Sequence, residues 1–151
     1  MSSTVKKSAA AMVGEAKARI ENLPPGRVAE EVAGGVLLVD IREADERAKN
    51  GVISGAVHAP RGMLEFYADP TSPYHRPEFE PARRIILHCA SGGRSALATD
   101  TLVSLGYERV AHLDGGLKAW KEEGLRCRRS SHSARLFLSA GDGLRTDRAR
   151  R

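Results

Sequence analysis

The sequence predicts an α/β fold: an open, mainly parallel sheet with helices on both faces. Two unbroken apolar runs, residues 36–39 and 85–87, are bounded by glycine or polar residues and show no alternation of apolar and polar positions. Such runs are typical of strands that are buried on both faces of a parallel sheet. Helical stretches separate them from two shorter candidate strands, and this alternation of strand and helix favours one α/β domain.

The chain begins with an Ala-rich segment, residues 8–22, in which apolar side chains recur every four positions. This spacing predicts a helix, which the run Pro24-Pro25-Gly26 would end. We expect residues 1–27 to form this leading helix and a linker, outside the repeating pattern that follows. A short helix over residues 28–32 should end at Gly34.

The rest of the expected domain, residues 28–125, repeats strand and helix. The shorter strands are predicted at residues 55–59 and 109–113, and helices at residues 43–50, 63–67, 94–105 and 117–123. Residues 69–81 contain four prolines, which predicts a loop.

Positive charge is concentrated at the end of the chain. The formal net charge is +5, but eight arginines and only two aspartates follow from Arg126 onward, which gives +6 there and −1 for residues 1–125. A nucleic-acid-binding domain has its positive charge on the folded face, so we expect no specific nucleic-acid partner. Residues 126–151 lack an apolar pattern and are expected to be a disordered basic tail.

The cysteines and the first residues indicate a compartment. Only Cys89 and Cys127 occur, which excludes a disulfide scaffold. No segment has the pattern of a secretory signal or the roughly 20 apolar residues of a membrane helix. We therefore expect a cytoplasmic protein with no membrane partner. Cys127 is interpreted as a bystander in the tail in preference to a resolving thiol.

The segment that carries chemistry is residues 85–97. A buried strand ends at Cys89, a turn containing Gly92 and Gly93 follows, and Arg94 begins an amphipathic helix. Ligands of open α/β sheets bind at the carboxyl ends of strands, and the amides of a glycine-rich turn can converge on an anion there. We expect Cys89 to be a thiolate nucleophile held by loop amides, with Arg94 adding positive charge. The plain alternative is a buried structural cysteine.

Four segments together resemble the rhodanese homology domain, in particular its single-domain bacterial type. Residues 89–95 are similar to its active-site loop, and residues 39–43 to its first-strand signature. Residues 51–60 are similar to its G-x-I-x-G-A-x-H-x-P motif, and residues 113–120 to its closing L-x-G-G-x-x-x-W signature. The resemblance covers about residues 28–125, and four motifs in the right order are more specific than any one of them.

The resemblance implies a sulfurtransferase in which Cys89 and Arg94 are catalytic. The Cys89 thiolate would take the outer sulfur of thiosulfate or of a persulfide donor and pass it to cyanide, a thiol or a protein thiol. The residues expected to bind the sulfur and its donor are Ala90, Ser91, Gly92, Gly93 and Ser95. The resemblance implies neither a metal nor an organic cofactor.

Other functions stay open from the sequence. A binding or regulatory module with the same fold but no turnover would need a damaged loop, whereas this loop keeps Cys89 and Arg94. Cysteine phosphatases and arsenate reductases need a wider loop for a tetrahedral oxyanion, with five residues between cysteine and arginine. Four residues separate Cys89 from Arg94 here, and Ser95 stands where that spacing needs the arginine. A third alternative is a protein that binds nucleic acid or a membrane surface through its basic tail.

Further side chains are expected to support the loop. Asp40 and Arg42 follow the first buried strand, where they would either brace the loop by hydrogen bonds or form a surface ion pair. Asp114 precedes a glycine pair and is expected to cap the next helix. His88 is excluded as the base, because neighbouring side chains of a strand point to opposite faces and Cys89 is its neighbour. The histidines and cysteines have no spacing typical of a zinc site.

Overall fold

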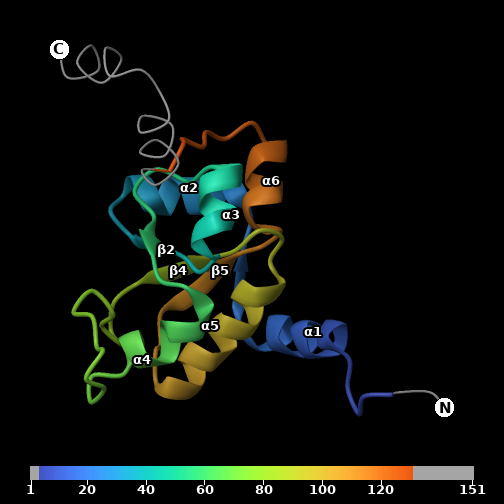
Figure 1. Cartoon of the computed structure of the whole chain (residues 1–151), viewed down its shortest axis with the longest axis vertical. Coiled ribbons are helices and arrows are strands. Elements are labelled where there is room, and N and C mark those ends of the chain that lie inside the picture. The colour runs from blue at the N-terminus through green and yellow to red at the C-terminus, as the bar shows by residue number, and fades with distance from the viewer. Residues whose placement is uncertain (1–3, 131–151) are drawn as a thin grey trace.

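In residues 4–130, which the computed structural model describes, five strands form one sheet in which every pairing is parallel (Figure 1). The strand order is β1-β5-β4-β2-β3. The strands are β1 (Glu21–Leu23), β2 (Leu37–Asp40), β3 (Val57–His58), β4 (Ile85–His88) and β5 (Val110–Leu113). The helices are α1 (Ala9–Arg19), α2 (Pro25–Ala33), α3 (Ala44–Asn50), the 3₁₀ turn η1 (Arg61–Met63), α4 (Leu64–Ala68), α5 (Gly93–Leu105) and α6 (Gly116–Glu122).

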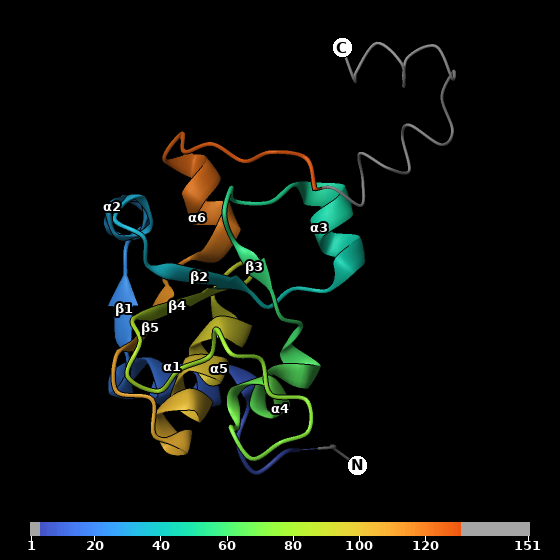
Figure 2. The same cartoon turned by 90° about the vertical axis from the view of Figure 1, so that its left-hand side faces the viewer.

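Helices cover both faces of the sheet. Figure 2 shows α2, α3 and α6 on one side and α1, α4 and α5 on the other. All residues of β2 and β4 are buried, so these strands are apolar without alternation. Leu38 and Ile86 pack in the cluster that includes α2 and α6, whereas Val39 and Leu87 pack in the cluster that includes α4 and α5. The predicted fold class is confirmed.

The first strand was not predicted. The helix expected over residues 8–22 ends at Arg19, and β1 follows it directly and pairs with β5. β1 has three residues, of which only Leu23 is buried, and so short a segment shows no periodicity. The leading helix is packed on the domain, because α1 lies against α5 and its Arg19 pairs with Asp100.

The prolines expected to stop the first helix also begin the second. Pro25 is the first residue of α2, three residues earlier than predicted. Proline is well tolerated at this position because the first amides of a helix have no intrahelical acceptor. The other strands lie within one or two residues of the predicted ranges, and α3, α5 and α6 begin or end within one residue of theirs. Residues 69–81 contain no helix or strand, as predicted.

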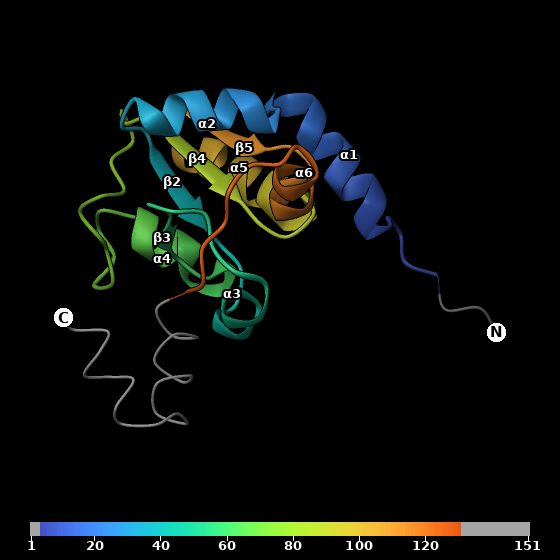
Figure 3. The ribbon, with the colours of Figure 1, turned by 90° about the horizontal axis from the view of Figure 1, so that it is seen from above.

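Part of the expected tail is bound to the domain. Val52 and Arg128 exchange two backbone hydrogen bonds, of 2.7 and 2.8 Å, and the indole N–H of Trp120 donates to the carbonyl of Arg126 at 2.9 Å. Cys127 is half-buried against the cluster that contains Trp120. The segment runs from the end of α6 toward β3 and α3 (Figure 3). Residues 126–130 are therefore ordered, and the rest of the predicted tail, residues 131–151, lies outside the described residues.

Candidate active site

Cys89 stands at the carboxyl end of β4, in the middle of the sheet. The loop that follows leads into α5 through Gly92, which has a φ of +105°. A side chain at Gly92 would place its Cβ 3.1 Å from the amide nitrogen of Gly115, so this conformation and this packing both favour glycine. The loop is therefore packed against the turn that begins α6.

That turn fixes the orientation of the loop. The carbonyls of Cys89 and Ala90 accept hydrogen bonds from the amides of Leu117 and Lys118, at 2.9 and 3.0 Å. A Cβ on Gly116 would lie 2.6 Å from the carbonyl carbon and oxygen of Ala90. Because α6 binds the carbonyls at the start of the loop, amides further along the loop face the sulfur.

Two of the predicted loop residues donate to the sulfur. The Sγ atom of Cys89 accepts from the amide of Gly92 at 3.1 Å and from the amide of Ser95 at 3.4 Å. The Ser95 hydroxyl lies 3.5 Å from the same sulfur. Cys89 is only 1% exposed and also borders the apolar cluster below the sheet, so its sulfur is held between hydrocarbon and inward-facing amides. These contacts stabilise a negative charge on sulfur.

The other loop residues have different surroundings. Ala90 faces α6 through its carbonyl, Ser91 is exposed, and Gly93 is the first residue of α5. The structure thus brings the predicted residues together in one loop, in which the amides of Gly92 and Ser95 donate to the sulfur.

Arg94 is held by an acidic partner that sequence analysis missed. Its guanidinium donates to both carboxylate oxygens of Glu46 at 2.8 Å, and the Arg94 side chain is 41% exposed. The hydrogen bonds from Arg94 lower the pKa of Glu46 to about 2. Glu46 also closes a capping box with Glu43 at the start of α3, beside the carboxyl end of β2. That Glu-x-x-Glu spacing after a buried strand signals the start of a helix, but it does not reveal the pairing of Glu46 with Arg94.

Asp40 and Arg42 form a buried ion pair, so the surface alternative is wrong. Both side chains have 0% exposure, and Arg42 donates to the two Asp40 oxygens at 3.0 and 2.8 Å. Arg47 adds a third donor at 3.0 Å, and Arg42 also binds the carbonyl of Gly51. Burial alone would raise the pKa of Asp40, but the hydrogen bonds from Arg42 and the charges of His88 and Arg42 lower it to about 2. The pair fixes the end of β2 beside the Cys89 strand.

Two side chains near the loop have structural contacts. Asp114 was expected to cap α6, but that helix begins at Gly116 with Gly115 in the capping position and without a side-chain cap. Asp114 instead pairs with Lys17 of α1 at 2.8 Å, because the strand end faces that helix. His88 is buried, with one ring nitrogen 3.1 Å from the carbonyl oxygen of Cys89 and the other 3.7 Å from Asp40.

His112 is the residue near the sulfur that sequence analysis passed over. Its Nδ1 lies 2.9 Å from the Ser95 hydroxyl, and its Nε2 lies 2.8 Å from Oδ1 of Asn22. The signal was its place in β5: Leu87 pairs with His112 in the register, so His112 lies beside the end of the Cys89 strand. Burial lowers the pKa of His112 to about 4, with Asp114 acting in the opposite direction.

The profile of the rhodanese-like domain matches residues 25–123 of the chain. The chain belongs to the rhodanese-like domain family.

Similar proteins support this assignment. Over 90 residues the domain is 38% identical to a sulfurtransferase of Allochromatium vinosum, covering 60% of this chain and 76% of that one. A solved Rhodopseudomonas palustris protein of unknown function, whose description suggests a tyrosine phosphatase, is 38% identical, with a TM-score of 0.79 over 85% of this chain and 99% of that one. The polysulfide-sulfur transferase of Wolinella succinogenes is 28% identical, with a TM-score of 0.63 over 81% of this chain and 88% of that one.

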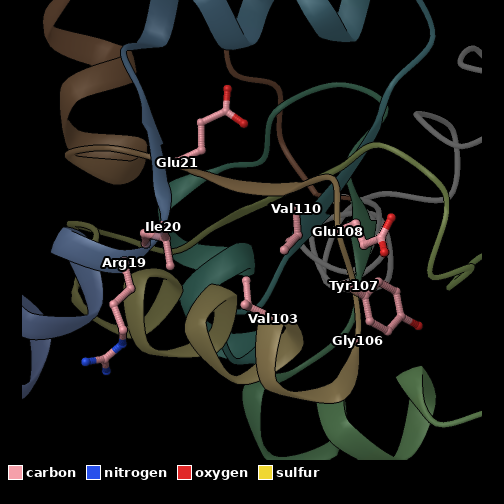
Figure 4. Close-up of a pocket in the computed structure, with 8 residues that line it drawn as sticks. All are labelled: Arg19, Ile20, Glu21, Val103, Gly106, Tyr107, Glu108 and Val110. Atoms are coloured by element: carbon pink, nitrogen blue, oxygen red, sulfur yellow. The ribbon is translucent and has the colours of Figure 1, made fainter.

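One pocket of the rhodanese-like domain lies away from the sulfur. It has a volume of about 490 Å³ and is formed where β1 and β5 begin, at the opposite ends of the strands from Cys89 (Figure 4). Two of its charged residues already have partners elsewhere: Arg19 binds Asp100 and Glu21 binds Arg84. A smaller pocket of about 270 Å³ lies beside the active loop, with Ala90, Lys118 and Lys121 in its lining.

Residues 4–130 contain no group of three or more His, Cys, Asp or Glu side chains that could hold a metal ion. Over the same range, every helix is too short or too polar to cross a bilayer.

Proposed function

We propose that this rhodanese-like domain is a sulfurtransferase that moves a sulfane sulfur through a persulfide on Cys89. The observation that carries the proposal is the hydrogen bonding of Sγ, which accepts from the amides of Gly92 and Ser95 at the carboxyl end of β4. A loop of inward-facing amides is the arrangement expected for a sulfur that carries negative charge in its reaction.

The proposed reaction has two steps. The Cys89 thiolate attacks the outer sulfur of thiosulfate, the S–S bond of the donor breaks, and sulfite leaves with its electron pair. The persulfide that remains on Cys89 is then attacked at its outer sulfur by cyanide, a thiolate or a protein thiolate, which regenerates the thiolate of Cys89. A persulfide donor follows the same course, with a thiolate as leaving group. No oxidant, metal or organic cofactor takes part in this balance.

Charges around the loop favour anionic donors. Lys118 and Lys121 line the pocket beside Ala90, and Lys121 is tied to the carbonyl of Asn50 at 2.7 Å. We propose that this pocket admits the anionic end of the donor. Arg94 binds Glu46, so we assign it a positioning role that holds the start of α5 against α3, together with its charge near the loop. Ala90, Ser91 and Gly93 complete the proposed binding loop.

The size of the active loop distinguishes this site from a phosphatase site. Four residues lie between Cys89 and Arg94, and the guanidinium is engaged by Glu46. A tetrahedral phosphate needs a wider ring of donors than one terminal sulfur. A non-catalytic binding role would not explain why two backbone amides donate hydrogen bonds to Sγ. Both cysteines are free thiols, and we propose the cytoplasm, where thiols stay reduced, as the compartment.

The proposal is tested by loading the protein with thiosulfate and measuring its intact mass. We expect the wild type to gain the mass of one sulfur atom and to lose it on addition of cyanide. Cys89→Ser should gain nothing, because the nucleophile is removed. Cys127→Ser is the matched control, since it removes the other cysteine, and it should load like the wild type.

An unchanged mass of folded wild-type protein, with thiosulfate or an organic persulfide as donor, would contradict the proposal. The same preparations should be assayed with an aryl phosphate. Faster turnover of the phosphate than of thiosulfate would reverse the choice between the two activities.

A further inference from the structure

The side chains behind Cys89 form a continuous hydrogen-bonded line across three strands and a helix. From the sulfur it runs to the hydroxyl of Ser95 at 3.5 Å, to Nδ1 of His112 at 2.9 Å, and from Nε2 of His112 to Oδ1 of Asn22 at 2.8 Å. Ser95 and His112 have 0% exposure. Polar groups buried to this extent need partners, so the direction of each hydrogen bond can be worked out from the partners present.

Asn22 fixes the direction of the whole line. Its side-chain nitrogen donates to the carbonyls of Lys17 and Ile20, at 2.9 and 3.2 Å. Carbonyls only accept, so this amide nitrogen must face them and Oδ1 must face His112. Because Oδ1 also only accepts, Nε2 of His112 carries a proton and donates it to Asn22.

The tautomer of His112 then decides the role of Ser95. A neutral imidazole with its proton on Nε2 has a bare Nδ1, which accepts from the Ser95 hydroxyl. The hydroxyl has a single proton, which it donates to Nδ1 of His112. Only lone pairs of its oxygen are then left to face the sulfur. In this state it accepts from the S–H of Cys89. The carbonyl of Gly92, 3.3 Å from the same oxygen, is a weaker competing acceptor for the hydroxyl proton.

We propose that Ser95, His112 and Asn22 form a proton relay that removes the thiol proton of Cys89. The inference rests on the proposed function, because it treats Cys89 as a nucleophile, and it adds a route by which that nucleophile is made. Ser95 is the group that touches the reacting sulfur, and His112 and Asn22 act through it as positioning residues.

The step balances with every donor satisfied before and after. The S–H proton moves to the Ser95 oxygen while the original hydroxyl proton moves to Nδ1 of His112. The product is a thiolate that accepts from the Ser95 hydroxyl, next to an imidazolium that donates through Nδ1 to Ser95 and through Nε2 to Asn22. The net change is the transfer of one proton from Cys89 to His112, with no oxidation or reduction. The amides of Gly92 and Ser95 stabilise the new negative charge on the sulfur.

The charged surroundings allow both states. The charged groups that act on the ring are Lys17 on α1 and Asp114 at the end of β5. Burial keeps the ring neutral while the thiol is intact, since it lowers the pKa of His112 to about 4. Lys17 and Asp114 are paired at 2.8 Å and largely cancel. Once the sulfur is negative, an opposite charge lies two hydrogen bonds away and favours the imidazolium.

The relay is tested by the rate at which iodoacetamide alkylates Cys89 as a function of pH, in a Cys127→Ser background. This reaction reads thiolate formation and needs no sulfur donor, so it reports on the relay even if sulfur transfer is absent. We expect Ser95→Ala and His112→Phe to move the midpoint of the rate upward by about one pH unit, which lowers the rate roughly tenfold at pH values well below both midpoints. His75→Phe, the same change at a histidine in the loop over residues 69–81, should leave the midpoint unchanged.

Two further measurements separate a relay from a structural role. The Ser95→Ala, His112→Phe double variant should shift the midpoint no further than either single variant, because residues of one relay act as a unit. ¹⁵N spectra of the wild-type imidazoles should show His112 with its proton on Nε2 at neutral pH. A proton on Nδ1, or a midpoint that does not move in Ser95→Ala, would overturn the relay. If His112→Phe does not fold, Ser95→Ala decides, since it leaves the bond between His112 and Asn22 intact.

Discussion

Among single residues, Asp40 and Arg42 form a buried ion pair on which the stability of the fold depends. Two ionised side chains with no exposure are stable only because each satisfies the other, with Arg47 and the Gly51 carbonyl as added partners. Removing one charge from such a pair leaves the other buried and uncompensated, which costs about 3–5 kcal/mol.

We therefore expect Asp40→Asn to lower the free energy of unfolding by about 3 kcal/mol or more, measured by urea unfolding at pH 7. The matched control is Glu65→Gln, which breaks the half-exposed pair with Arg61 and should cost about 0.5 kcal/mol.

The pH dependence of this difference has a defined sign. The pKa of Asp40 is about 2 in the folded protein and 3.8 ordinarily, so its stabilising effect is present at neutral pH. It is lost as the pH falls from about 4 toward 2. The stability of wild type and Asp40→Asn should therefore converge over that range, and a constant difference would show that Asp40 is not the titrating group.

At the scale of elements, the active loop is shaped by the turn that begins α6. Gly115 and Gly116 both have positive φ angles, and Gly116 packs directly on the backbone of Ala90 and Ser91. The first amides of α6 then bind the loop carbonyls. The last family motif therefore contributes to the site without contacting the sulfur, by fixing which way the loop amides point.

Gly116→Ala is expected to slow sulfur transfer as well as to destabilise the fold. Its Cβ would lie 2.6 Å from the Ala90 carbonyl and 2.7 Å from the Ser91 amide nitrogen, so the loop must move. Gly124→Ala is the matched control, because Gly124 also has a positive φ, of +76°, but a Cβ there meets no atom within 4 Å. Gly124→Ala should lose about 1 kcal/mol of stability through backbone strain, and Gly116→Ala should lose more because its Cβ also meets backbone atoms of the loop.

Only Gly116→Ala should slow persulfide formation, by roughly tenfold or more, a factor that corresponds to about 1.4 kcal/mol in the barrier. Equal rates of sulfur loading in the two variants, measured by intact mass over time, would show that the packing of α6 on the loop does not control the site.

Features that depend on residues close together in the sequence could be predicted, whereas features that depend on residues far apart along the chain could not. Strands β2 and β4 and helix α5 have continuous local patterns, and they were predicted to within two residues. The loop from Cys89 to Ser95 was found because its chemistry is contiguous. β1 was missed because its three residues gain their strand geometry from pairing with β5. The Glu46 partner of Arg94 and the Asn22 partner of His112 lie 48 and 90 residues away along the chain, and no local pattern reports them.

Across the domain as a whole, helix α1 and residues 126–130 are attached to the sheet by different contacts. α1 packs on α5 and its Lys17 reaches Asp114, so the start of the chain supports the site side of β5. The end of the domain crosses back to Val52, directly after the Gly51 carbonyl that Arg42 binds. Residues 126–130 thus stabilise the α3 side of the sheet, and they do so apart from any function of the basic residues that follow.

This division predicts different outcomes for two truncations. A chain that ends at Ser130 keeps both hydrogen bonds between Val52 and Arg128 and the bond from Trp120 to Arg126, so it should melt at a higher temperature than a chain that ends at Leu125. A chain that ends at Leu125 loses these bonds and uncovers the edge of Trp120. We expect it to lose about 2 kcal/mol, a fall in melting temperature of roughly 5 °C.

Both truncated chains should still gain sulfur on Cys89, because the hydrogen bonds described for Arg126 and Arg128 go to Trp120 and Val52 and not to the loop. Calorimetry and intact mass on the same preparations provide the check. A loss of sulfur loading in the chain that ends at Ser130, with its melting temperature unchanged, would mean that residues 131–151 take part in donor or acceptor binding. The basic tail would then belong to the reaction, since the folded domain would be intact but unable to complete it.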